Sequence, residues 1–185
     1  MSWEKDKGYL TNYAQLFQKD IKLHNKDNWF CRALSWIVFI ITFGKKDRKS
    51  WMENVAFAAA NHHFYPAKWS TKTIEDKIPH EAFHTKDMNA CGLFIHPMVG
   101  LLPFLILYYL VPIPIGFAYA RLVFELRAKE AEWMENKPKL QAMQTDADKF
   151  VESISGATYL WAVPKFFAKR QTDKVVEKVY ATYLG

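Results

Sequence analysis

The five residues His80-Glu81-Ala82-Phe83-His84 constrain this chain more than any other stretch. Residues four positions apart lie on one face of an α-helix, so both imidazoles can reach the same atom if the stretch is helical. Two neutral histidines and one further ligand hold a zinc ion and leave one position for water. Glu81 is placed to take a proton from that water. The pattern H-E-x-x-H therefore predicts a zinc site with His80 and His84 as ligands and Glu81 as catalytic base.

The neighbouring residues favour a metal site over a chance match. Three fixed letters do arise by accident, and two surface histidines beside a glutamate would then have no function. Here Ile78, Ala82 and Phe83 are apolar, so this part of the helix is expected to be buried. Buried histidines and a buried glutamate need partners, which a metal ion supplies. Because proline is tolerated in a first helical turn, the helix is predicted to begin near Pro79 and to run to about Asn89.

Length and composition predict one domain. A chain of 185 residues, half of them hydrophobic, can build a single dry core. The two cysteines, Cys31 and Cys91, are too few for a disulfide scaffold and lack the spacing of metal ligands.

The charge pattern indicates a mixed, solvated surface. The net charge is +6 and the pI is about 9.2, which would suit nucleic acid, anionic lipid or a cell-wall polymer. The lysines are interspersed with acidic residues, as in residues 169–174, and no nucleic-acid motif occurs, so nucleic-acid binding is not expected. The charged residues 1–7 are followed by no apolar signal-peptide core. A cytoplasmic or virion-associated protein is the expectation.

The apolar pattern predicts several helices and a small sheet in the first half of the chain. Residues 8–28 are expected to form a short helix with loops, and residues 29–43 a buried or interfacial helix that is too short to span a membrane. Small and aromatic residues between 53 and 69 predict one or two short strands. Adjacent strand residues face opposite sides, so at most one of His62 and His63 could join a metal site.

The second half of the chain is expected to be helical. Residues 101–111 are strongly apolar, but the prolines at 112 and 114 end this run, which favours a buried helix over a membrane span. Peripheral membrane contact is the alternative for residues 29–43 and 100–115. Further helices are predicted over 115–133, over 138–153 and from about 171. The fold class is α+β, rich in helix.

A catalytic zinc site needs a third protein ligand. Glu125 stands between Phe124 and Leu126, where a carboxylate is costly unless it is paired or bound to metal. An ion pair with Arg121, one turn earlier, would also satisfy it. Glutamates in the charged run that follows are expected to be solvated or paired with lysines. The candidates are His96, Glu125, Glu130 and Glu132, with Glu125 favoured.

Three segments together resemble a known group of proteins. These are the H-E-x-x-H stretch, the helical residues 121–128 and the segment Ser155-Gly156-Ala157-Thr158-Tyr159-Leu160-Trp161. They are similar to small zincin-like proteins of bacterial and phage genomes, which belong to the glutamate-liganded zincins. The resemblance covers about residues 33–170 and leaves 1–28 as an N-terminal extension. It implies a zincin-like domain, zinc held by His80, His84 and Glu125, and a role for Tyr159 in orienting substrate or a developing oxyanion.

The sequence thus predicts a zinc-dependent metallopeptidase that hydrolyses an amide bond in a peptide, a protein or a peptidoglycan cross-link. Two alternatives stay open. One is a non-catalytic protein of a virion or other large assembly, in which zinc stabilises the fold. The other is a membrane-associated protein that uses the apolar stretches.

Overall fold

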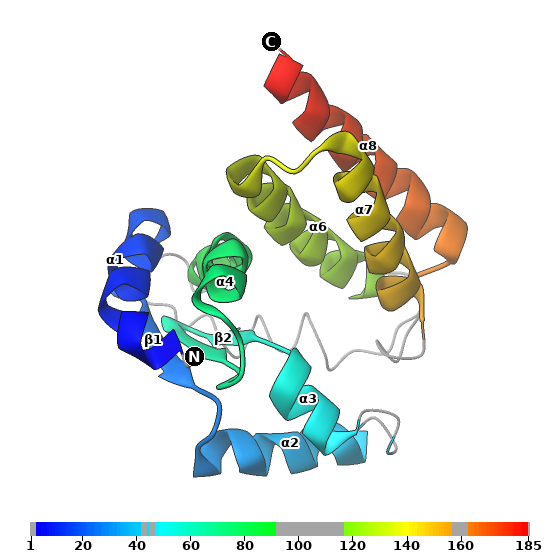
Figure 1. Ribbon diagram of the computed structural model, residues 1–185. Helices are drawn as coiled ribbons and strands as arrows, with labels where there is room; N and C mark the ends of the chain where they lie inside the picture. Colours follow the sequence, from blue (N-terminus) through cyan, green and yellow to red (C-terminus); the bar gives the residue numbers. More distant parts are fainter. Residues whose placement is uncertain (1–2, 42–43, 45–46, 92–116, 157–162, 185) are drawn as a thin grey trace. The chain divides into compact units, whose positions relative to one another are not determined.

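The computed structural model describes residues 3–41, 44, 47–91, 117–156 and 163–184 (Figure 1). The chain is rich in helix and contains a small three-stranded sheet, in agreement with the expected α+β class. It forms two compact units, Met1–Pro103 and Phe104–Gly185. The organisation into a single domain stays a prediction. Within the described residues, no helix combines the length and the apolar character that crossing a bilayer requires.

The first unit holds the sheet and the predicted motif helix. The strands expected between residues 53 and 69 are confirmed, whereas the strand β1 and the helix α3 were not predicted from the sequence. The elements are η1 (Trp3–Asp6), α1 (Lys7–Phe17), β1 (Lys22–Asn25), α2 (Trp29–Ile41), α3 (Arg48–Asn54), β2 (Phe57–Ala59), β3 (His62–Tyr65) and α4 (Thr71–Cys91).

β3 is the central strand of the sheet, parallel to β1 and antiparallel to β2. Alternate residues of a strand face opposite sides. His63 and Tyr65 are fully buried on one face, while His62 and Phe64 are only partly buried on the other. The expectation that adjacent histidines of this segment point to opposite sides is therefore confirmed.

The buried face of the sheet contributes to the main core of the first unit. The indole of Trp3 is fully buried and its Nε1 donates a hydrogen bond to the main-chain oxygen of Pro66, 3.2 Å away. This bond fixes the start of the chain to the segment that follows β3. The core residues are Trp3, Leu10, Ala14, Ile21, Leu23, Tyr65, Ile74, Ile78 and Ala82.

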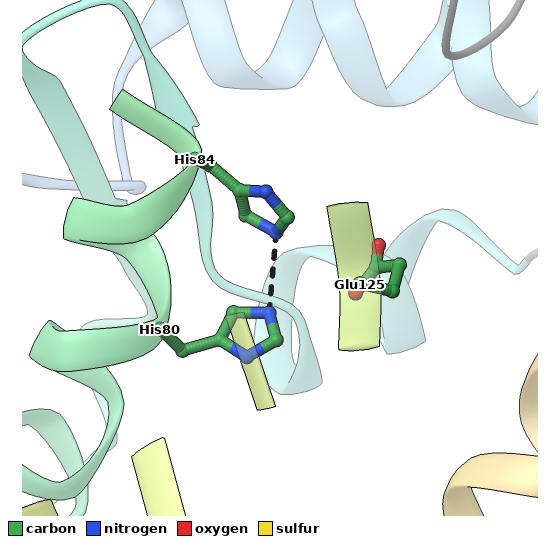
Figure 2. A group of neighbouring side chains, drawn as sticks. All are labelled: His80, His84 and Glu125. Atoms are coloured by element: carbon green, nitrogen blue, oxygen red, sulfur yellow. Dashed lines mark hydrogen bonds between the residues drawn. The ribbon is translucent and has the colours of Figure 1, made fainter. Parts of the chain in front are cut away.

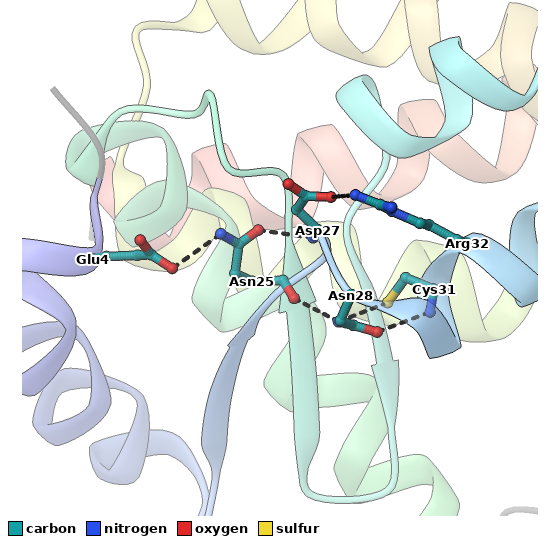
Figure 3. Close-up of polar contacts among 6 residues, drawn as sticks. All are labelled: Glu4, Asn25, Asp27, Asn28, Cys31 and Arg32. Atoms are coloured by element: carbon teal, nitrogen blue, oxygen red, sulfur yellow. Dashed lines mark hydrogen bonds and ion pairs between the residues drawn. The ribbon is translucent and has the colours of Figure 1, made fainter.

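A set of asparagine contacts determines how the chain passes from β1 into α2 (Figure 3). Asn28 caps the helix, because its Oδ1 accepts a bond of 2.9 Å from the main-chain N–H of Cys31. Its Nδ2 donates to the main-chain oxygen of Asn25 at 2.6 Å. Asp27 and Arg32 form an ion pair of 2.6 Å across the first turn. The side chains of Asp27 and Asn28 therefore fix the first turn of α2 to the end of β1.

Lys26 is a fully buried lysine at this junction. Its Nζ donates to the main-chain oxygen of Trp51, in the last turn of α3, at 2.8 Å, and to that of Val55, the C-cap residue, at 2.9 Å. The same ammonium lies 3.3 Å from the centroid of the Trp51 ring. Burial lowers the pKa of Lys26 to about 7, although Cys31 and Glu81 act in the opposite direction. A cation at a helix C-terminus is favourable, so Lys26 stabilises the end of α3. Removing its ammonium from water opposes this gain.

The second unit consists of the described helices α6 (Phe117–Asn136), α7 (Leu140–Ser155) and α8 (Lys165–Leu184). The helices predicted over 115–133 and 138–153 are confirmed, and the last helix begins six residues earlier than expected. Inside this unit Lys129 bonds Asp146 at 2.8 Å, and Trp133 Nε1 donates to the same carboxylate at 2.9 Å. These bonds join α6 to α7 beside two apolar clusters. The predicted helix over 101–111 lies outside the described residues.

Lys26→Met is expected to remove a pH dependence of stability. The folded pKa of about 7 lies below the usual value of 10.5, so the unfolded chain binds more protons between these two pH values. The unfolding free energy of the wild type should therefore rise by about 2 kcal/mol from pH 7 to pH 9, and that of the variant should lack this rise. Urea unfolding at the two pH values measures it. The exposed Lys19→Met is the control, and a parallel rise in wild type and Lys26→Met would contradict the assignment.

Candidate metal centre

The motif histidines lie on α4, which begins earlier than the sequence predicted. Ser70 caps the helix, since its Oγ accepts the main-chain N–H of Thr73 at 3.1 Å. Pro79 is therefore in the interior of the helix and buried, so the expectation that it occupies the first turn is wrong. Proline in a helix interior removes one i to i−4 bond. Packing of Ile74 and Ile78 in the core of the first unit stabilises the turns before the proline.

His80 and His84 face each other one helical turn apart (Figure 2). Their Nε2 atoms are 3.2 Å apart, the ring centroids are 4.9 Å apart and the ring planes are nearly perpendicular, at 83°. Two nitrogens bound to one tetrahedral zinc at about 2.0–2.1 Å are separated by about 3.3 Å. The separation in this pair is close to that value. The helix alone thus brings two imidazole nitrogens to the spacing that a shared zinc ion requires.

Glu81 is buried on the same helix, between the two histidines in sequence. Its charge acts on two other groups inside the first unit. Burial raises the pKa of Tyr65 well above its usual value, and the Glu81 carboxylate adds to the rise. The same carboxylate counteracts the fall in the pKa of Lys26. Glu81 therefore belongs to an interior that also contains a neutral phenol and a buried amine, neither of which was predicted from the sequence.

A hydrogen-bonded chain next to the motif fixes α4 against the sheet. The hydroxyl of Thr85 donates to the main-chain oxygen of Ala60 at 2.7 Å. Because a hydroxyl has one proton, the contact of 2.9 Å between Thr85 Oγ1 and His63 Nε2 is donated by the imidazole. Burial lowers the pKa of His63 to about 3, and the neighbouring His84 adds to the fall. His63 is therefore a neutral ring with its proton on Nε2, and it serves to position α4.

Glu125 is a buried residue of α6 in the second unit. It lies between Leu122 and Leu126 of an apolar cluster, as its sequence context predicted. The sequence favours its carboxylate as the third ligand beside the His80 and His84 imidazoles, and this stays a prediction. These two imidazole nitrogens and one carboxylate oxygen are ligands that zinc accepts in catalytic sites.

The other candidate ligands have other partners or lie outside the described residues. Glu130 pairs with Lys178 at 2.5 Å and Glu132 with Lys129 at 3.2 Å, which confirms that these glutamates are paired with lysines. Neither His96 nor Tyr159 is among the described residues.

Thr85 directly follows the motif, and Ala60 lies in the tight connection between β2 and β3. A buried hydroxyl of this kind has no signature in a single sequence beyond its place next to the second histidine. His63 had one signal, the alternation of a strand, which placed at most one of two adjacent histidines on the inner face.

No family model, curated protein or solved structure matches the chain.

Thr85→Val is expected to destabilise the protein by about 2 kcal/mol. The substitution leaves the buried N–H of His63 and the oxygen of Ala60 without their partner, at little change in side-chain volume. Chemical denaturation measures the loss. Thr85→Ser, which keeps the hydroxyl, should recover most of it. Thr145→Val, at an exposed threonine, should stay within about 0.5 kcal/mol of wild type. Equal losses for the valine and serine variants at position 85 would assign the effect to packing instead.

Proposed function

We propose that the chain is a zinc-dependent metallopeptidase with a zincin-like fold, in which His80, His84 and Glu125 bind Zn²⁺. The spacing of 3.2 Å between the two Nε2 atoms carries the proposal, because it suits two ligands of one tetrahedral ion. The position of a buried glutamate next to the first histidine adds a group that can handle protons.

The donor set fits zinc in a catalytic site. Three protein ligands, two histidines and one carboxylate, leave a fourth tetrahedral position for water or substrate. The same donors also suit iron(II), so the identity of the metal is part of the test. Bound zinc would supply a Lewis acid that polarises the substrate carbonyl and lowers the pKa of the attacking water.

Glu81 performs the proton transfers in the proposed mechanism. Its carboxylate accepts the proton of the attacking water and then delivers it to the departing amide nitrogen. Its placement on α4 beside His80 keeps the base and the two histidine ligands on one helix, which packing and the Thr85 bond hold in place. Tyr159 is proposed to orient the substrate or to donate to the developing oxyanion.

The proposed substrate is an amide bond of a peptide, a protein or a peptidoglycan cross-link. These share a carbonyl that a metal can polarise and a nitrogen leaving group that needs a proton. A zinc-stabilised assembly protein without a catalytic role would keep the ligands and dispense with the base, so the two functions differ in what Glu81 and the fourth position do.

Purified wild-type protein is expected to contain zinc in equal amount to the chain. His84→Ala and Glu125→Ala should lower zinc affinity by at least about a hundredfold, because each removes a ligand. Glu81→Gln should retain the metal. Elemental analysis and titration with a zinc indicator measure both. Glu130→Gln is the matched control, since it neutralises another glutamate of the same helix. Full zinc content in Glu125→Ala would remove that residue from the ligand set, and iron in place of zinc would refute the zinc assignment.

Cobalt substitution is expected to show whether a coordination position is open. In the Co²⁺ protein, acetohydroxamate should shift the visible absorption bands if solvent occupies one corner of the site, and should have no effect on a closed structural site. Glu81→Gln should bind the hydroxamate yet release no amine from a mixed peptide library that the wild type cleaves. Cleavage by Glu81→Gln at the wild-type rate would exclude the proposed base.

A further inference from the structure

We propose that α2 binds the surface of an anionic phospholipid bilayer, with its apolar face in the lipid and its axis parallel to the membrane plane. This proposal concerns a surface of the first unit and does not depend on the proposed peptidase activity. The sequence predicted a buried or interfacial helix here; a wholly buried helix is excluded by the exposure of its large side chains.

The exposed apolar residues of α2 form one continuous face. They occur at positions 29, 30, 33, 36, 37 and 40, a spacing that places them on one side of a helix. Trp29 is 80% exposed and Ile40 is 67% exposed, and Trp36 and Ile37 are each about half exposed. A row of large apolar side chains in water is unfavourable and marks an interaction site. The opposite side of the helix contributes Cys31 and Ser35, which are buried.

The length of α2 suits a position in the membrane interface. Thirteen residues of helix extend about 20 Å, whereas the hydrocarbon layer is about 30 Å thick. Two tryptophans, Trp29 and Trp36, lie on the apolar face, and tryptophan prefers the boundary between lipid chains and headgroups. A helix that is short, apolar on one face and rich in aromatic residues is typical of binding in the plane of the interface.

Basic side chains along one edge of this face select an anionic surface. The guanidinium of Arg48 lies 3.7 Å from the centroid of the Trp36 ring, and its Nε donates to Ser35 at 3.3 Å. Lys49 is next to it on α3, and neither basic residue forms an ion pair within the described part of the chain. Cationic groups beside an apolar helix face add electrostatic attraction to acidic lipid headgroups.

These basic residues line a hollow of about 570 Å³ between α2 and α3. Two acidic residues also line it, and both have other partners: Asp47 accepts the main-chain N–H of Ser50 at 2.7 Å, and Glu53 pairs with Lys68 at 2.7 Å. Arg32 also lines the hollow but pairs with Asp27 at 2.6 Å, so Arg48 and Lys49 are the lining cations that a lipid phosphate could neutralise. The hollow adjoins Trp36, so a headgroup bound there would have its acyl chains beside the apolar face.

Vesicle binding by the full chain tests the proposal. Wild type should bind vesicles of equal parts phosphatidylcholine and phosphatidylglycerol, bind pure phosphatidylcholine at least several-fold less, and lose affinity as salt is raised. Trp29→Gln with Ile40→Gln should lower the partition coefficient at least about tenfold. Lys49→Gln should reduce the preference for anionic vesicles, whereas the exposed Lys19→Gln should not.

The matched control removes the same kind of surface elsewhere. Leu16 and Phe166 are 79% and 77% exposed and lie on other helices, so Leu16→Gln with Phe166→Gln should bind within about twofold of wild type. Trp29→Phe keeps the apolar face and should bind normally, but brominated lipid chains should quench its tryptophan fluorescence less than that of the wild type. This comparison does not require a destabilising substitution.

Three outcomes would overturn the proposal. The first is that the wild type fails to bind anionic vesicles, or that the variant with Trp29 and Ile40 replaced binds them as tightly as the wild type. The second is an equal loss in the control that lacks Leu16 and Phe166. The third is a wild-type dimer in light scattering that separates when Trp29 and Ile40 are replaced, because the face would then be covered by a second copy of the chain.

Discussion

The cost of burying polar groups is the constraint on which the first unit depends. An unsatisfied buried donor or acceptor costs about 1–3 kcal/mol, which is a large part of the stability of a small domain. The chain meets this cost with specific contacts. Thr85 links a buried imidazole to a main-chain oxygen. The buried ammonium of Lys26 donates a hydrogen bond to the last turn of α3, which offsets part of its desolvation cost. The metal proposed for His80 and His84 follows the same logic.

Local patterns in the sequence predicted most of the helices and the pair of motif histidines. Apolar runs with helical spacing gave α2, α6 and α7, because one face of each helix must be removed from water. The position of His80 relative to His84 needed only the pitch of a helix. Burial of Glu125 followed from the leucine beside it. These are all short-range properties, which a single sequence contains.

What the sequence did not predict depends on residues that are distant in the chain. β1 is only four residues long and exists through parallel pairing with β3, about forty residues later. α3 is short and polar, and its one local signal was the capping pair Asp47 and Ser50. Lysine is rarely buried, so nothing in the sequence indicated that Lys26 would lie inside the core.

The interior position of Pro79 divides α4 into two hydrogen-bonded stretches. A residue at this position would normally donate its amide proton to the carbonyl of Glu75, and proline has none to donate. The stretch before it is anchored by Ile74 and Ile78 in the hydrophobic core, and the stretch after it by the bond from Thr85 to Ala60. Unwinding that begins at the amino end of the helix should therefore stop directly before the motif. The spacing of the two imidazoles then does not depend on whether the turns before Pro79 are intact.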